Sequence, residues 1–145
     1  MFKKILLAID GSEESKKAEK YAFELSKNLS GEITAINVVE ISVDAMERVA
    51  LNRAFERVLA PDAMERNSKN FLRAFKARAK KKGIKATVIS RVGRAWNEII
   101  SESDSGNYSI IVLGSKGLSG IKRMLIGSVA ENVVRHSKCP VLIVK

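Results

Sequence analysis

The chain has 145 residues, of which 46% are apolar, so it can bury one hydrophobic core without disulfides or a metal. Its 26 Lys and Arg outnumber its 16 Asp and Glu, and the resulting net charge of +10 favours anionic partners. One Cys and one His exclude a disulfide within the chain and cannot supply the three or four protein ligands of a zinc site. We therefore expect a single domain over residues 1–145 with no metal site.

The first predicted strand, Lys4–Ile9, is an apolar run that Asp10 ends. The run is far too short for a signal peptide core or a membrane span, so we expect a cytoplasmic protein without membrane association. A helix follows, with an apolar stripe of helical period and two glutamates in its first turn, where negative charge is favoured. The residues from Asn28 to Gly31 end this helix, and the β-branched run Glu32–Val39 predicts the second strand.

The stretch Ser42–Lys82 is too long for one simple crossover helix, and its apolar periodicity breaks at Pro61. We predict two helical pieces, the second with Pro61 as its first residue and Gly83 as its C′ residue. The first piece either covers a site or packs on the sheet as an insertion. We favour the insertion, because long connections often have no chemical role.

The densest basic cluster, Lys76 to Lys85, falls mostly on the last turns of the second piece, where cations complement the helix dipole. No aromatic residues alternate with these charges, as a binder of single-stranded nucleic acid would need. We therefore interpret the cluster as a solvated helix end and do not expect nucleic acid as a partner.

Three further strands are predicted at Lys85–Val92, Ser109–Leu113 and Val141–Val144, with short helices between them around Ile99 and Val133. Strands that alternate with helices are typical of stacked βαβ units. The predicted fold class is α/β, with an open five-stranded parallel sheet and helices on both of its faces.

Residues that follow the strands are the first candidates for a site, because ligands of such sheets bind beyond the carboxyl ends of the strands. After the fourth strand come Gly114, Gly117 and, nine residues later, the pair Gly127-Ser128. Glycines let the backbone approach a phosphate closely, and Ser128 opens a helix whose unpaired N–H groups favour an anion. Ser128 also fits a capping box with Glu131, so it can cap its own helix, and both roles can hold. The chain has neither a P-loop nor a dinucleotide fingerprint.

The remaining polar candidates are less specific. Asp10 follows the first strand and could either hold ribose hydroxyls or brace the turn into the first helix. Nucleophilic catalysis needs a base beside the nucleophile, but the one His, His136, lies near the end of the last helix, where it suits the helix dipole. We therefore expect no catalytic residues, and we interpret Cys139 as a small buried side chain.

Three segments closely resemble the universal stress protein family: Lys4 to Ser12, Val112 to Val133 and Cys139 to Val144. Their G-x2-G-x9-G-(S/T) spacing is similar to the family's ATP-binding signature and is complete here, unlike in the branch that does not bind ATP. The resemblance implies a Rossmann-like fold of the adenine nucleotide alpha hydrolase type, with strand order 3-2-1-4-5. It also implies ATP as the ligand, alone or with Mg²⁺, and a homodimer that pairs Val141–Val144 across a two-fold axis.

Carried over position by position, the resemblance implies a set of nucleotide-binding residues. They are Asp10 near the ribose, Ala8 beside it, Val38 flanking the adenine, and Leu113, Gly114, Gly117, Gly127, Ser128 and Val129 around the ribose and phosphates. The family often has Gly-x-Pro after the third strand, whereas Gly93-Arg94-Ala95 lacks the Pro, which puts the shape of that loop in doubt.

The function implied is regulation in a stress response, through a conformation or assembly that depends on bound ATP. Two alternatives stay open. One is a slow ATPase with weak hydrolysis, and the other is a basic nucleic-acid-binding protein that uses the +10 charge.

Overall fold

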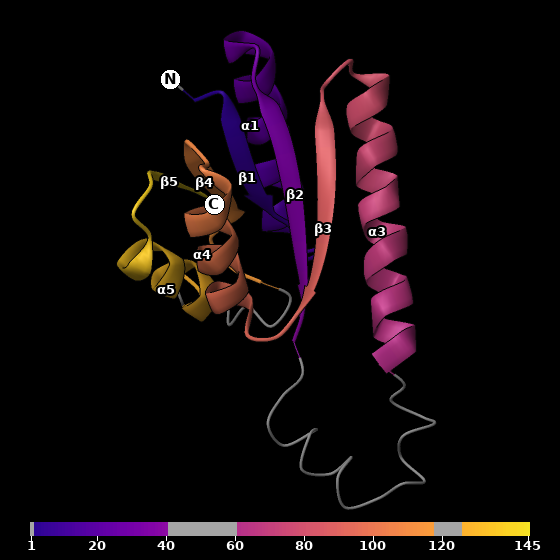
Figure 1. Cartoon of the computed structure of the whole chain (residues 1–145), viewed down its shortest axis with the longest axis vertical. Helices are drawn as coiled ribbons and strands as arrows, with labels where there is room; N and C mark the ends of the chain where they lie inside the picture. Colours follow the sequence, from indigo (N-terminus) through magenta and orange to yellow (C-terminus); the bar gives the residue numbers. More distant parts are fainter. Residues whose placement is uncertain (1, 41–60, 118–125) are drawn as a thin grey trace, which may run out of the picture.

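The described strands form one parallel sheet in the computed structural model, which describes residues 2–40, 61–117 and 126–145 (Figure 1). The strands are β1 (Lys4–Ala8), β2 (Glu32–Val39), β3 (Ala86–Val92), β4 (Ile110–Gly114) and β5 (Val141–Val144). Their order is β3-β2-β1-β4-β5, and every neighbouring pair is parallel. The predicted fold class and strand order are confirmed, and no strand end differs from the prediction by more than one residue.

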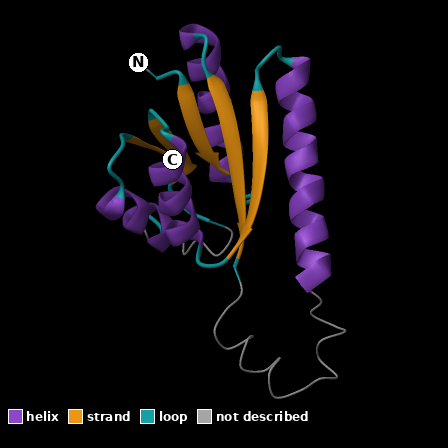
Figure 2. Ribbon diagram, viewed as in Figure 1, coloured by secondary structure: helices purple, strands orange, loops and turns teal. Residues whose placement is uncertain are grey.

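The central strands are mostly apolar because helices cover both faces of the sheet. In β1, the side chains of Ile5, Leu6 and Leu7 are fully buried. The described helices are α1 (Glu13–Leu29), α3 (Pro61–Lys81), α4 (Ala95–Gly106) and α5 (Ser128–His136). Figure 2 shows these helices in layers on either side of the strands.

Two apolar clusters, one on each face of the sheet, hold these layers together. On one face, α1 and α3 meet over β1 and β2, where the rings of Phe23 and Phe75 stack with their centroids 5.7 Å apart. On the other face, Ile99 of α4 and Val133 of α5 pack against Leu6 and its neighbours. Both clusters place helix N-termini near the carboxyl end of the sheet, where the predicted site residues lie.

The predicted C-terminal end of α3 agrees with the structure, since Gly83 follows it with a φ of +69°. Pro61 is the first described residue of α3, so its place as the first helical residue stays a prediction. The Gly83 N–H donates to the Lys80 carbonyl and the Ile84 N–H to the Ala79 carbonyl, which is the Schellman pattern. The first helical piece predicted between Ser42 and Pro61 lies outside the described residues.

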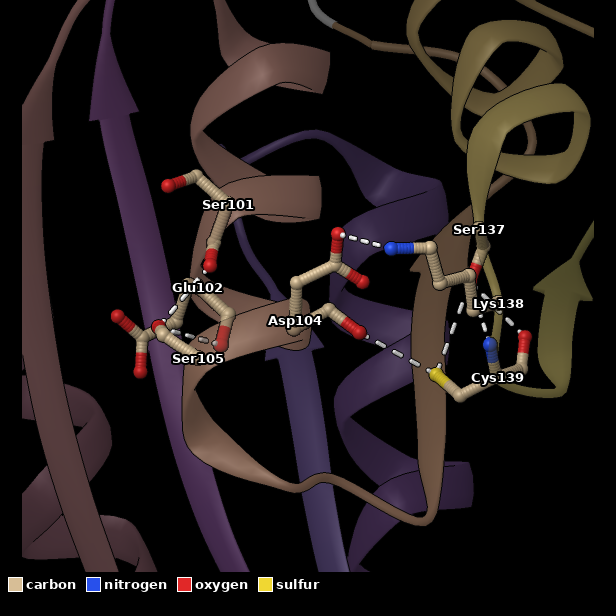
Figure 3. Close-up of polar contacts among 8 residues, drawn as sticks. Ser101, Glu102, Asp104, Ser105, Ser137, Lys138 and Cys139 are labelled. Carbon is tan, nitrogen blue, oxygen red and sulfur yellow. Dashed lines mark hydrogen bonds and ion pairs between the residues drawn. The ribbon is translucent and has the colours of Figure 1, made fainter.

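The turn before β5 is fastened to α4 by side-chain contacts (Figure 3). Lys138 Nζ lies 3.2 Å from Asp104 Oδ2, and the Ser103 hydroxyl lies 3.3 Å from Cys139 Sγ. Ser137 donates a hydrogen bond of 2.9 Å to the Cys139 carbonyl. Cys139 is half-buried, so the prediction of a buried side chain is only partly correct, because the thiol lies at the edge of a polar turn.

Candidate functional site

A cavity of about 840 Å³ lies beyond the carboxyl ends of β1, β2 and β4. This volume is within the range of small-molecule sites. The cavity lies where the strand order reverses between β1 and β4, which is the place where ligands bind in open α/β sheets. All nine predicted binding residues line it: Ala8, Asp10, Val38, Leu113, Gly114, Gly117, Gly127, Ser128 and Val129. The structure thus brings the predicted residues together, while their contact with a nucleotide stays a prediction.

The turn from β1 into α1 is held by a compact set of hydrogen bonds. Asp10 Oδ1 accepts from the Ser12 N–H at 2.9 Å, and the Asp10 N–H donates to Ser15 Oγ at 3.1 Å. Ser12 caps α1, since its hydroxyl oxygen accepts from the Ser15 N–H at 3.1 Å. One oxygen of Asp10 therefore braces the turn, as one of its two predicted roles requires.

The second oxygen of Asp10 faces the glycine-containing loop after β4. A Cβ atom added to Gly117 would lie 3.0 Å from Asp10 Oδ2. Asp10 is exposed at this position and lines the cavity. Its bracing role leaves Oδ2 available for a ligand hydroxyl, so the two roles that the sequence left open are compatible.

The loop after β4 is tied to the rest of the site through its backbone. The Ser115 N–H donates to the Val144 carbonyl at 2.7 Å, and the Gly127 N–H donates to the Ser115 carbonyl. The Ser12 hydroxyl donates to the Lys116 carbonyl at 3.4 Å. The two glycine segments and the N-terminus of α1 therefore form one connected wall of the cavity.

The N-terminus of α5 lies in this wall without a side-chain cap. Its N-cap residue is Gly127, and no side chain hydrogen-bonds there. The capping-box interpretation of Ser128 is wrong, because Ser128 is already the first helical residue and the Glu131 N–H donates to the Gly127 carbonyl instead. The first-turn amides of α5 therefore keep the positive potential that suits an anion.

Gly114 has a packing role that sequence reasoning missed. A Cβ atom there would lie 2.7 Å from Glu14 Cβ, 2.8 Å from the Glu14 carbonyl carbon and 2.9 Å from the Ser15 nitrogen. No side chain other than hydrogen fits between β4 and the first turn of α1. Gly114 therefore sets the position of that turn, whether or not a ligand is bound.

A polar network on the β2 side of the cavity also escaped the sequence analysis. Asn37 Nδ2 donates to the Ile9 carbonyl at 2.7 Å, and the Ser68 hydroxyl donates to Asn37 Oδ1 at 2.7 Å. Ser68 also lies 2.9 Å from the Ser90 hydroxyl. These residues come from three different elements, so the one local signal was an Asn near the end of a mostly apolar strand.

In the loop after β3, Ala95 stands where the family often has Pro, and its N–H makes a hydrogen bond. The Ala95 N–H, at the first position of α4, donates to Glu40 Oε1 at 2.8 Å. Proline has no N–H and could not make this bond. Both Glu40 and Ala95 line the cavity, so the departure from the family pattern joins the end of β2 to the start of α4.

Other kinds of site find no support within the described residues. None of their Cys, His, Asp and Glu side chains gather in groups of three that could hold a metal ion. In the same ranges, no helix combines the length and the hydropathy needed to cross a membrane.

Known proteins resemble this chain over its whole length. The model of the universal stress protein family matches residues 1–145. Universal stress protein MJ0531 of Methanocaldococcus jannaschii is 33% identical over 145 residues, which cover 100% of this chain and 83% of that protein.

Two solved structures extend the comparison to three dimensions. The structure of hypothetical protein MJ0577 has a TM-score of 0.86 and 31% identity, and the match covers 100% of this chain and 96% of the other. A universal stress protein in complex with cAMP has a TM-score of 0.72 and 25% identity, over 99% of this chain and 97% of that one. With the family model matched from the first residue to the last, this chain belongs to the universal stress protein family.

Proposed function

We propose that this protein binds ATP in the cavity at the carboxyl end of the sheet. In this proposal Asp10 holds the ribose, Val38 flanks the adenine, and the phosphates lie on the wall formed by Gly117, Gly127 and Ser128. The observation that supports it most directly is the uncapped N-terminus of α5, which lines the same cavity as Asp10 at the point where the strand order reverses.

The chemistry of the lining supports a nucleotide in one orientation. The apolar residue Val38 supplies surface for a base, while Lys116 and the α5 N-terminus supply positive potential for phosphates. A related universal stress protein has been solved in complex with cAMP, which supports a nucleotide as the class of ligand.

We further propose that ATP acts through conformation or assembly, as a regulator in a stress response. Strand β5 is an edge of the sheet, and residues Val141 to Ile143 are only partly buried. Pairing of Val141–Val144 with a second copy would cover this edge. Light scattering with and without ATP tests the assembly route, and a monomer under both conditions would exclude assembly and leave a change of conformation.

The binding proposal is tested by calorimetric titration of the protein with ATP and with AMP, each with and without Mg²⁺. Asp10→Asn keeps an oxygen for the Ser12 N–H but removes the carboxylate from the ribose, so it should weaken both nucleotides by about tenfold or more. Lys116→Gln removes a positive charge beside the phosphates and should weaken ATP more than AMP. No binding of ATP to the parent at millimolar concentration would refute the proposal.

The ion pair between Asp104 and Lys138 supplies matched controls, because it lies outside the cavity lining. Asp104→Asn and Lys138→Gln repeat the two chemical changes on that pair and should leave both affinities unchanged. Gly127→Val is a poorer test, since a Cβ atom there would lie 3.2 Å from the Ser115 carbonyl oxygen and would disturb the loop itself. Equal losses in the Asp10 and Asp104 variants would show that Asp10 has no special role.

A further inference from the structure

We propose that one flank of α3 binds the phosphate backbone of duplex nucleic acid. The charge distribution along the chain is the first observation behind this proposal. Residues 66–97 contain 11 Lys and Arg and no Asp or Glu, whereas the rest of the chain contains 15 Lys and Arg against 16 Asp and Glu. The whole net charge of +10 therefore originates in residues 66–97, most of which belong to α3 and β3.

The second observation is a row of cations on α3, which we call the basic stripe. It consists of Arg66, Lys69, Arg73, Lys76 and Lys80, all of them exposed. Their separations of three, four, three and four residues place them on one flank of the helix. At 1.5 Å per residue the stripe is about 21 Å long.

The face of α3 beside the stripe is anchored in the core. Leu72, Phe75 and Ala79 are buried against the sheet. The backbone under the stripe is therefore held in place, and the five side chains project from a fixed row of positions before any partner arrives. A fixed row binds a regular line of negative charges with less loss of conformational entropy than a mobile tail would.

Three of the six other cations of this region, Arg78, Lys85 and Arg91, form ion pairs with acidic residues far away in the sequence. Arg78 pairs with Glu19 at 2.7 Å, and Arg91 pairs with Glu102 at 3.1 Å. No ion pair between described residues involves any member of the basic stripe. Lys76 and Lys80 also line a shallow hollow beside the first residues of the edge strand β3. The stripe is therefore an accessible positive surface at one edge of the molecule, where Figure 1 shows α3 beside β3.

The length of the stripe fits a duplex. Each DNA strand carries one phosphate per about 3.4 Å of helix axis, so about 21 Å of the duplex holds about twelve phosphates on its two strands, and those on the near side lie within reach of the five cations. A single strand is a poorer fit, because single strands are bound by stacking on exposed aromatic rings. On α3, Phe75 is buried and Phe71 lines the nucleotide cavity. The absence of aromatic residues among these cations therefore disfavours a single strand but not a duplex.

An anionic membrane is also a poorer fit. Helices that bind membrane surfaces insert an apolar face beside their cations. Here that face, with Leu72 and Phe75, already packs on the sheet. Phosphate contacts along a duplex need no insertion, so the geometry favours the duplex.

The proposal is tested with the whole protein by fluorescence anisotropy of a labelled duplex of about 25 base pairs. The dissociation constant is measured from 50 to 200 mM KCl. Five phosphate contacts predict a slope of about −4.5 for the logarithm of affinity against the logarithm of salt, which is about 20-fold weaker binding per doubling of salt. The triple variant R73Q/K76Q/K80Q should retain a slope of about −1.8, or about 3.5-fold per doubling.

A matched control separates the stripe from net charge alone. The triple variant K17Q/K20Q/K27Q removes the same charge from exposed positions of α1 and should keep the parent slope. An equal decrease in slope in both variants would overturn the proposal, because general charge would then explain the binding. Urea unfolding midpoints check that both variants fold, and K76Q/K80Q, with an expected slope of about −2.7, replaces the stripe variant if that one does not fold.

Three further probes test the partner. Phosphatidylserine vesicles, a single strand of the same sequence and polyglutamate are each titrated under the same conditions. Duplex binding that is tighter than all three supports the proposal. Tighter binding of any of the three, or a parent slope near zero, overturns it. The nucleotide cavity is untouched by these variants, so failure here would not weaken the ATP proposal.

Discussion

Replacing Gly114 with Ala should destabilise the protein even when no nucleotide is present. The added Cβ would lie 2.7–2.9 Å from three atoms of the first turn of α1, two of which belong to the backbone. A rigid backbone cannot move aside as a flexible side chain can, so β4 and α1 must separate. Overpacking of this kind costs about 1–3 kcal/mol. For a chain of this size the melting temperature should fall by roughly 3–9 °C.

The assay is urea unfolding of the nucleotide-free protein, followed by circular dichroism. Gly83 provides the matched comparison, because a Cβ atom there meets nothing within 4 Å but the φ of +69° is unfavourable for most residues. Gly83→Ala should cost about 1 kcal/mol, and Gly83→Asn should recover part of this loss, since Asn tolerates positive φ. At Gly114 the cause is steric, so Gly114→Asn should be no better than Gly114→Ala.

Two results would refute this reasoning. If Gly114→Ala unfolds at the same urea concentration as the parent and loses only ATP affinity, then Gly114 serves the ligand and not the packing of α1. If Asn rescues position 114 as it rescues Gly83, then the backbone conformation and not the close approach requires glycine there.

Three further predictions concern single side chains around the site and the core. Ser12→Ala removes the cap of α1 and should lower the free energy of unfolding by about 1 kcal/mol in urea titrations. Burial, together with the Glu102 carboxylate, raises the pKa of Tyr108 from its usual 10 to about 12. The neutral phenol is therefore favoured in the folded state, so the stability that it contributes is complete below pH 10 and is lost as pH rises toward 12. The free energy of unfolding of Tyr108→Phe should therefore fall less steeply than that of the parent over this range. Glu40→Ala should lower the free energy of unfolding by about 1 kcal/mol in the parent. In an Ala95→Pro background the hydrogen bond is already absent, so the same substitution should have almost no effect, and a double-mutant cycle measures the difference.

The features of the fold that depend on residues close together in the sequence were predictable from it. Strand β2 was predicted with its observed bounds, because a run of β-branched residues between two turns is a local signal. The end of α3 was predicted because Gly83 follows directly after the last helical residues. The alternation of strands and helices then fixes a parallel sheet, whose order follows the family resemblance.

The contacts that cross between elements were not predictable in this way. The Asn37–Ser68–Ser90 network joins β2, α3 and β3, and no local pattern relates residues so far apart. The bond from Ala95 to Glu40 depends on two loops that meet only in the folded sheet. The capping-box prediction for Ser128 failed because the pattern gives the spacing to Glu131 but not the residue at which the helix begins.

Ligand binding and folding both constrain the residues of this site, so a sequence motif alone cannot show which of the two requires a given residue. Gly114 belongs to the ATP-binding pattern, yet the packing of α1 already requires a glycine there. Asp10 also has a structural and a candidate binding role, because one of its oxygens braces the turn while the other faces Gly117. A substitution at either position therefore changes stability and affinity together. The two roles separate only when unfolding without nucleotide and binding of nucleotide are measured on the same variant, and Asp10→Asn, which keeps the bracing bond, is the change that separates them best.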